Sequence, residues 1–74
     1  MPVEVIVTWP ASVAPEERDK INAEIGRVLR ILLPYCSKIV YVDLEGVRMS
    51  VDENCIHEIQ GLQDSLKYVE VEIE

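Results

Sequence analysis

The sequence predicts an α+β fold of the ferredoxin-like type, in which two helices cover one face of a four-stranded antiparallel sheet. Residues 38–51 have the pattern of a β-hairpin, helical apolar periods follow the first strand and the hairpin, and both ends of the chain alternate between apolar and polar residues. The element order is therefore strand, helix, strand, strand, helix, strand. Right-handed crossovers then give the strand order 4-1-3-2 in a single domain spanning residues 1–74.

The first strand is expected at residues 2–9, because Val5 and Val7 alternate with Glu4 and Thr8 until Pro10 ends the ladder. A helix should follow from Pro15, with Ser12 as a cap in front of it. Its apolar stripe is Ile21, Ile25, Val28, Leu29 and Leu32, and Pro34 stops it. Glu24 and Arg27 are expected as a surface pair, and Gly26 as a point of close backbone approach.

The hairpin is predicted with Glu45 and Gly46 at its turn. This register pairs Leu44 with Val47, Val42 with Met49 and Val40 with Val51 on one apolar face. On the other face it pairs Asp43 with Arg48 and Tyr41 with Ser50.

Asp52 is expected to cap the second helix, whose apolar stripe is Cys55 or Ile56, Ile59, Leu62 and Leu66. Gly61 weakens this helix. The last strand is expected at residues 68–74, with Val69, Val71 and Ile73 facing inward and three glutamates facing outward.

The composition limits the function classes. The chain has 14 carboxylates against 7 lysines and arginines, and residues 38–74 hold most of the excess. Such a surface repels phosphate backbones and anionic lipids, so direct binding of nucleic acid or of a membrane is not expected. No stretch of about 18 apolar residues is present to span a membrane, and no signal peptide is visible at the start of the sequence.

With both helices on one face, the other face of the sheet is left open to a partner. We expect self-association or docking of another protein there, because a domain of this size gains stability from added burial. The expected contact residues are Ile6, Tyr41, Tyr68, Glu70, Glu72 and Glu74. The three glutamates would steer basic partners.

Cysteine and histidine chemistry is weakly indicated. Cys36 and Cys55 are too few for a disulfide framework, which indicates a reducing, cytoplasmic setting, although a single bridge between them stays open. Cys55 and His57 lie on different sides of a helix, and three such residues are too few for a closed zinc site. No metal and no cofactor are therefore expected.

The stretch from Pro2 to Glu45 resembles the β-α-β unit of the tautomerase superfamily, through PVEVIVTW, PEERDKINAEIGRVL and KIVYVDLE. The resemblance implies an enzyme in which the amine of Pro2 acts as a general base. The chain departs from that family in carrying Ser12 and Val13 where arginines would bind a substrate carboxylate, with Lys38 as the only base near the second strand.

The function that the sequence favours is a small acidic protein-interaction or regulatory module without enzymatic activity, acting through its open sheet face or an edge strand as a homodimer or with a larger protein. The alternatives are the Pro2 enzyme and a mimic of nucleic acid that blocks a basic partner.

Overall fold

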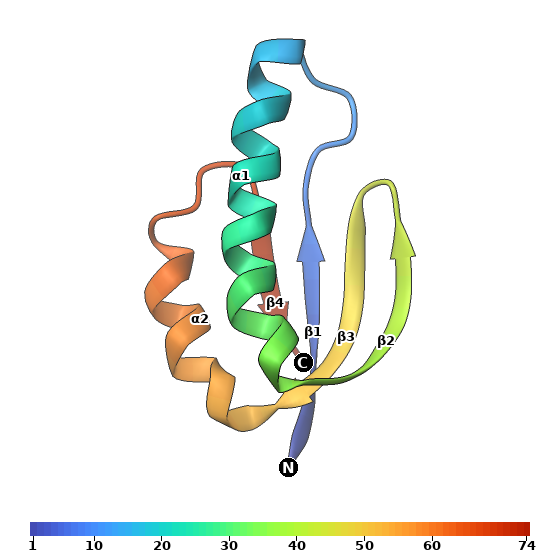
Figure 1. Ribbon diagram of the computed structural model, residues 1–74, viewed down its shortest axis with the longest axis vertical. Coiled ribbons are helices and arrows are strands. Elements are labelled where there is room, and N and C mark those ends of the chain that lie inside the picture. The colour runs from blue at the N-terminus through green and yellow to red at the C-terminus, as the bar shows by residue number, and fades with distance from the viewer.

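The computed structural model describes all residues from Met1 to Glu74 and contains one four-stranded sheet in the order β2-β3-β1-β4. The strands are β1 (Pro2–Thr8), β2 (Cys36–Asp43), β3 (Gly46–Asp52) and β4 (Glu70–Ile73). The helices are α1 (Pro15–Leu32) and α2 (Ile56–Gln63), with short 3-10 turns η1 (Leu33–Tyr35) and η2 (Glu53–Cys55). Read from the β4 edge, the strand order is the expected 4-1-3-2, so the predicted α+β fold is confirmed (Figure 1).

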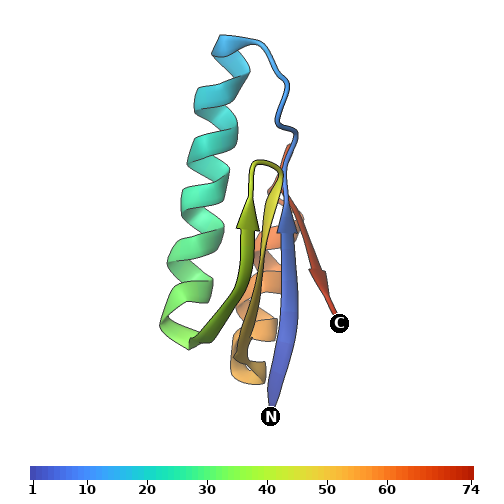
Figure 2. The same cartoon turned by 90° about the vertical axis from the view of Figure 1, so that its right-hand side faces the viewer.

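Strand β1 is central and pairs antiparallel with β3 on one side and β4 on the other. Its helix-facing residues Val5 and Val7 are fully buried, as the alternation predicts. Figure 2 shows α1 along one side of the sheet, with the opposite side bare. The fold therefore has two layers, and the core lies between the helices and the inner face of the sheet.

Helix α1 begins with Pro15 in its first turn and buries Ile21, Val28 and Leu32, which confirms its apolar stripe. Its cap residue is Ala14, so the assignment of Ser12 as a cap is wrong. The interpretation of Gly26 is also wrong, because a Cβ atom there would have no neighbour within 4 Å. The glycine faces solvent and no other chain segment approaches it.

Glu24 is buried, which the expected surface pair with Arg27 does not anticipate. Its Oε1 atom accepts hydrogen bonds from the backbone N–H groups of Tyr68 at 2.8 Å and Val69 at 3.0 Å, and Lys67 donates to both carboxylate oxygens. The carboxylate thus fixes the loop that leads into β4. Burial raises the pKa of Glu24, but these backbone hydrogen bonds outweigh it and leave the pKa below its usual range.

The hairpin register differs from the prediction. The two turn residues are Leu44 and Glu45, so Asp43 pairs with Gly46, Val42 with Val47 and Tyr41 with Arg48. The predicted pairing of Asp43 with Arg48 is therefore wrong. Beyond Tyr41 the ladder has two irregularities. The first is at Val40, after which Ile39 pairs with Met49 and Lys38 with Ser50, and the second is at Ser37, after which Cys36 pairs with Val51. One extra residue on one strand is the mark of a β-bulge.

The physical reason for this register lies in β1. Gly46 pairs with Thr8, and a Cβ atom on Gly46 would lie 2.5 Å from the carbonyl oxygen of Val7. The glycine is therefore needed inside the strand rather than in the turn. The turn itself is held by Asp43, whose Oδ1 accepts the N–H of Glu45 at 2.8 Å.

Trp9 also fixes the tip of the hairpin. Its backbone N–H donates to the carbonyl of Glu45, and its indole Nε1–H donates to the carbonyl of Leu44, both at 2.9 Å. The indole packs partly against the core, as a large aromatic at the end of a strand is expected to do.

The second half of the chain follows the prediction with shorter elements. Asp52 accepts a hydrogen bond from the N–H of Asn54 at 2.9 Å and so caps the turn that leads into α2. Val69 and Val71 are buried as expected, but β4 begins only at Glu70. Tyr68 therefore belongs to the loop that Glu24 holds, and its assignment to the sheet is wrong.

Candidate interaction surface

Strand β2 is the most exposed regular element of the molecule. The main core cluster has 11 buried residues from β1, α1, β3, α2, β4 and their connections, and none of them comes from β2. In Figure 1, β2 stands at the edge of the sheet clear of both helices. Its exposed apolar side chains and that of the turn are Ile39 (51%), Val40 (45%), Tyr41 (45%), Val42 (65%) and Leu44 (85%).

The register with β3 assigns each β2 side chain to a face. Val42 and Ile39 pair with Val47 and Met49, which are buried under the helices, so these two side chains lie on the helix side. They remain half or more exposed because the two helices cover the other strands. Tyr41 lies on the open side with Lys38 and Asp43. Both faces of β2 are therefore accessible.

The prediction placed six apolar hairpin residues on one face and Tyr41 on the other, and it did not anticipate that the apolar face of β2 stays exposed. Neighbouring strands supply the hydrogen bonds of a ladder, but only a helix above the strand can bury its side chains. The sequence pattern of β2 is as apolar as that of β3, so the exposure of β2 could not be read from it.

An ion-pair cluster occupies the centre of the open sheet face. The Nε atom of Arg48 donates to Oε1 of Glu4 at 2.7 Å, and its Nη2 atom contacts Oε2 of Glu74. The hydrogen bond from Arg48 lowers the pKa of Glu4. The cluster links β3, β1 and the residue that follows β4, which explains why a prediction based on the hairpin alone assigned Arg48 to Asp43.

The expected contact residues do not form one surface. Ile6 is partly buried beside Arg48, while Tyr41 is exposed on β2. Glu70 and Glu72 are exposed on β4 at the far edge, and Glu74 is engaged with Arg48. Together with the displacement of Tyr68, this leaves β2 and β4 as two separate edges of opposite character, one apolar and one acidic.

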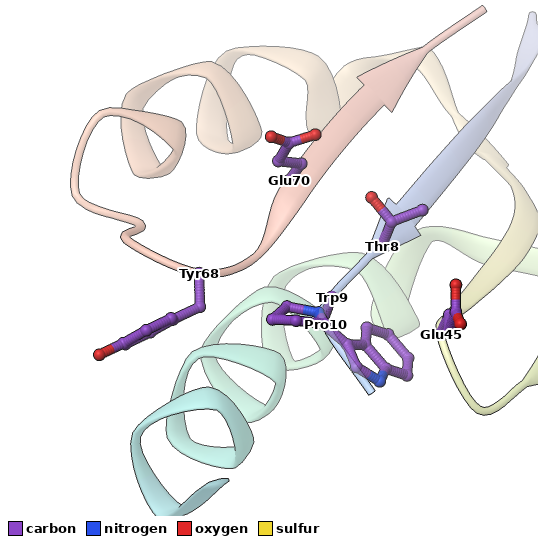
Figure 3. A pocket seen from close by; sticks show the side chains of 6 residues that line it. All are labelled: Thr8, Trp9, Pro10, Glu45, Tyr68 and Glu70. Carbon is purple, nitrogen blue, oxygen red and sulfur yellow. The ribbon is translucent and has the colours of Figure 1, made fainter. Parts of the chain in front are cut away.

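A shallow hollow of about 260 Å³ lies at the end of β1. It is lined by Thr8, Trp9, Pro10, Glu45, Tyr68 and Glu70. In Figure 3 these side chains spread apart, with the Tyr68 hydroxyl pointing away from Trp9. The indole N–H is already bonded to the carbonyl of Leu44, and Thr8, Glu45 and Glu70 lie apart in Figure 3, so the lining has no converging polar groups.

A second hollow lies beside Pro2, lined by Met1, Pro2, Tyr35, Ser37 and Asp52. The N-terminal ammonium group contacts Oε1 of Glu53 at 3.0 Å. No lysine or arginine lines this hollow, and the N-terminal ammonium group of Met1, which does line it, is already paired with Glu53.

Both cysteines are free thiols, so the bridge between them that the sequence left open is absent. No group of three histidine, cysteine or acidic residues is placed to hold a metal ion. Cys55 is fully buried in the core, and burial raises the pKa of its thiol. The position of Cys55 at the end of η2, inside the core, therefore suits a core side chain rather than a reactive thiol.

A thiol-labelling experiment checks this assignment. Cys36 is partly exposed, so a disulfide reagent at neutral pH should label one thiol per chain quickly and the second only on unfolding in urea. The Cys36→Ser variant should lose the fast phase alone. Fast labelling of two thiols in the folded protein would contradict the buried position of Cys55.

No helix of the structure combines the length and apolarity needed to cross a bilayer. No protein-family model matches the chain, and no solved structure matches it.

The chain does match a curated viral protein. It is 40% identical over 67 residues to uncharacterized protein 17 of Sulfolobus islandicus filamentous virus (isolate Iceland/Hveragerdi). The match covers 90% of this chain and 83% of the viral protein, so it spans nearly the whole domain rather than a shared segment. The chain therefore belongs to the same protein family as this viral protein.

Proposed function

We propose that the protein is a non-enzymatic interaction module that associates with a protein partner through the β2 edge. One observation carries the proposal, namely that β2 exposes four consecutive apolar side chains from Ile39 to Val42 at the edge of the sheet. An exposed edge strand offers unpaired backbone N–H and C=O groups along its length. An added strand can bond to these groups while its side chains pack on the apolar ones.

The length of β2 favours this edge over the other. β2 has 8 residues, whereas β4 has 4 and carries Glu70 and Glu72 on its exposed side. A longer edge strand can form more backbone hydrogen bonds with an added strand. The like charges on β4 oppose the close approach of another acidic strand to that edge. In this proposal β4 is the solvated edge, whose carboxylates steer basic surfaces without anchoring them.

The free cysteines and the small size of the domain are consistent with this proposal. Two free thiols suit a reducing compartment, so the proposed location is the cytoplasm. The small size of the domain supports it too, since added burial on association stabilises a short chain.

The Val42→Lys variant tests the proposal. Val42 is 65% exposed, so the variant should fold with near-native stability. Sedimentation velocity and pull-down with tagged protein should show association of the wild type that falls at least tenfold in this variant. The matched control Ala23→Lys, at an exposed position of α1, should associate like the wild type. Association that Val42→Lys leaves unchanged, or a wild type that binds neither itself nor another protein, would refute the proposal.

A further inference from the structure

We infer that the occupant of the β2 edge is a second copy of the chain, paired antiparallel to the first β2 about a two-fold axis through Tyr41. This inference rests on the proposed function and deepens it by naming the partner and its register. A two-fold axis perpendicular to the sheet makes the same residues meet on both sides. Directly opposed residues of an antiparallel pair point to the same face of the sheet, whereas neighbours along a strand point to opposite faces. The axis must therefore pass midway between the two copies of one residue.

Tyr41 is the position about which the side chains of β2 are symmetric. Val42 and then Asp43 follow it toward the turn, while Ile39 and then Lys38 precede it in the ladder, with Val40 as the extra residue of the bulge. When position is counted in residue pairs of the β2–β3 ladder (steps) rather than in residues, Val42 is one step and Asp43 two steps from Tyr41 on one side. Ile39 and Lys38 stand at the same steps on the other side.

The faces match as well as the steps. Val42 and Ile39 both lie on the helix side, because they pair with Val47 and Met49. Lys38 and Asp43 both lie on the open side with Tyr41. In the two-fold pair, Val42 of one copy therefore opposes Ile39 of the other, with Val40 beside it, since a bulge sets two residues against one.

The charges then complement each other at both ends of the contact. Lys38 of each copy faces Asp43 of the other across the open side, on either side of the two tyrosines. Opposite charges directly across an antiparallel pair are favourable, whereas like charges are not. Without the bulge at Val40, Lys38 and Asp43 would lie at unequal steps from Tyr41 and on opposite faces, so this bulge is what makes the edge of β2 self-complementary.

The acidic edges take the most distant positions in this arrangement. In the order β2-β3-β1-β4, joining two β2 strands leaves both copies of β4 at the outer edges of one continuous sheet. Glu70 and Glu72 of the two copies are then as far apart as the sheet allows. An acidic chain with net charge −7 can therefore associate through β2 with the least self-repulsion.

Charge reversal on the purified protein tests the register. The wild type should sediment as a dimer, and Lys38→Asp should weaken the dimer by roughly tenfold or more, because two carboxylates then face each other at each end. The double variant Lys38→Asp/Asp43→Lys should recover most of the wild-type affinity. Asp43 also accepts the Glu45 N–H, so Lys38→Asp/Asp43→Asn is the second rescue, since asparagine keeps that acceptor and removes the repulsion. Lys20→Asp on α1 is the control with the same change in net charge.

Cross-linking tests the axis itself. In a Cys36→Ser background, Tyr41→Cys should form a disulfide-linked dimer on mild oxidation, since directly opposed residues of antiparallel strands have Cα atoms about 4.5–5.5 Å apart, within disulfide reach. Tyr68→Cys in the same background should form no disulfide-linked dimer under those conditions, because residue 68 lies far from the β2 edge.

The outcomes separate this inference from the proposed function. A monomeric wild type that binds another protein in a Val42-dependent manner would overturn the inference and leave the proposed function intact. A dimer sensitive to Val42→Lys but not to Lys38→Asp would overturn the register alone. Failure of Val42→Lys to affect any association would overturn both.

Discussion

Replacing Gly46 by alanine should lower the free energy of unfolding by about 3 kcal/mol, the upper range of overpacking costs. The added Cβ atom would lie 2.5 Å from the carbonyl oxygen of Val7, which is backbone and cannot rotate away. Either β1 and β3 must separate or the hairpin must shift its register, and both disturb the centre of the sheet. Urea unfolding followed by circular dichroism measures the loss.

Gly26 and Gly61 provide matched controls for this prediction. They lie in α1 and α2, and a Cβ atom on either would meet nothing within 4 Å. Alanine favours a helix over glycine by about 1 kcal/mol, so Gly26→Ala and Gly61→Ala should each stabilise the protein. Equal stabilities for Gly46→Ala and the wild type would mean that β1 does not approach Gly46 as closely as described.

Replacing Glu24 by alanine should cost about 3 kcal/mol of stability, since three backbone N–H groups of the loop before β4 lose a charged acceptor. Glu24→Gln keeps one oxygen acceptor without the charge and should lose roughly half as much. Hydrogen exchange at Lys67, Tyr68 and Val69 should speed up in both variants. Unchanged exchange there would show that Glu24 does not hold the loop.

The same carboxylate makes stability depend on pH. The pKa of Glu24 is lower in the folded protein than the ordinary glutamate value of about 4.3. Its contribution to the free energy of unfolding is therefore fully present above the ordinary value and is lost as the pH falls through the folded pKa. The wild type should therefore lose more stability than Glu24→Gln between about pH 5 and pH 3. Parallel pH profiles for the two proteins, measured by urea unfolding at each pH, would contradict this assignment.

Local patterns in the sequence predicted the elements and their arrangement. The alternation of apolar and polar residues predicted both end strands, and the stripe through Ile21, Val28 and Leu32 predicted α1. The handedness of the crossovers then left one strand order. These signals succeed because they arise within one element, where side-chain spacing follows directly from the backbone period.

Contacts between distant segments decided the rest. The hairpin register depends on how closely Val7 approaches Gly46, and the inward turn of Glu24 depends on backbone donors more than 40 residues away. The exposure of β2 depends on how the two helices pack on the sheet, because they cover β1, β3 and β4 and leave β2 uncovered. A one-dimensional pattern shows that a side chain is apolar and which neighbours share its face, but only the packed structure determines whether anything covers that face. For this chain that difference turns β2 from an edge strand with one apolar side expected toward the helices into a strand exposed on both faces, on which the proposed function depends.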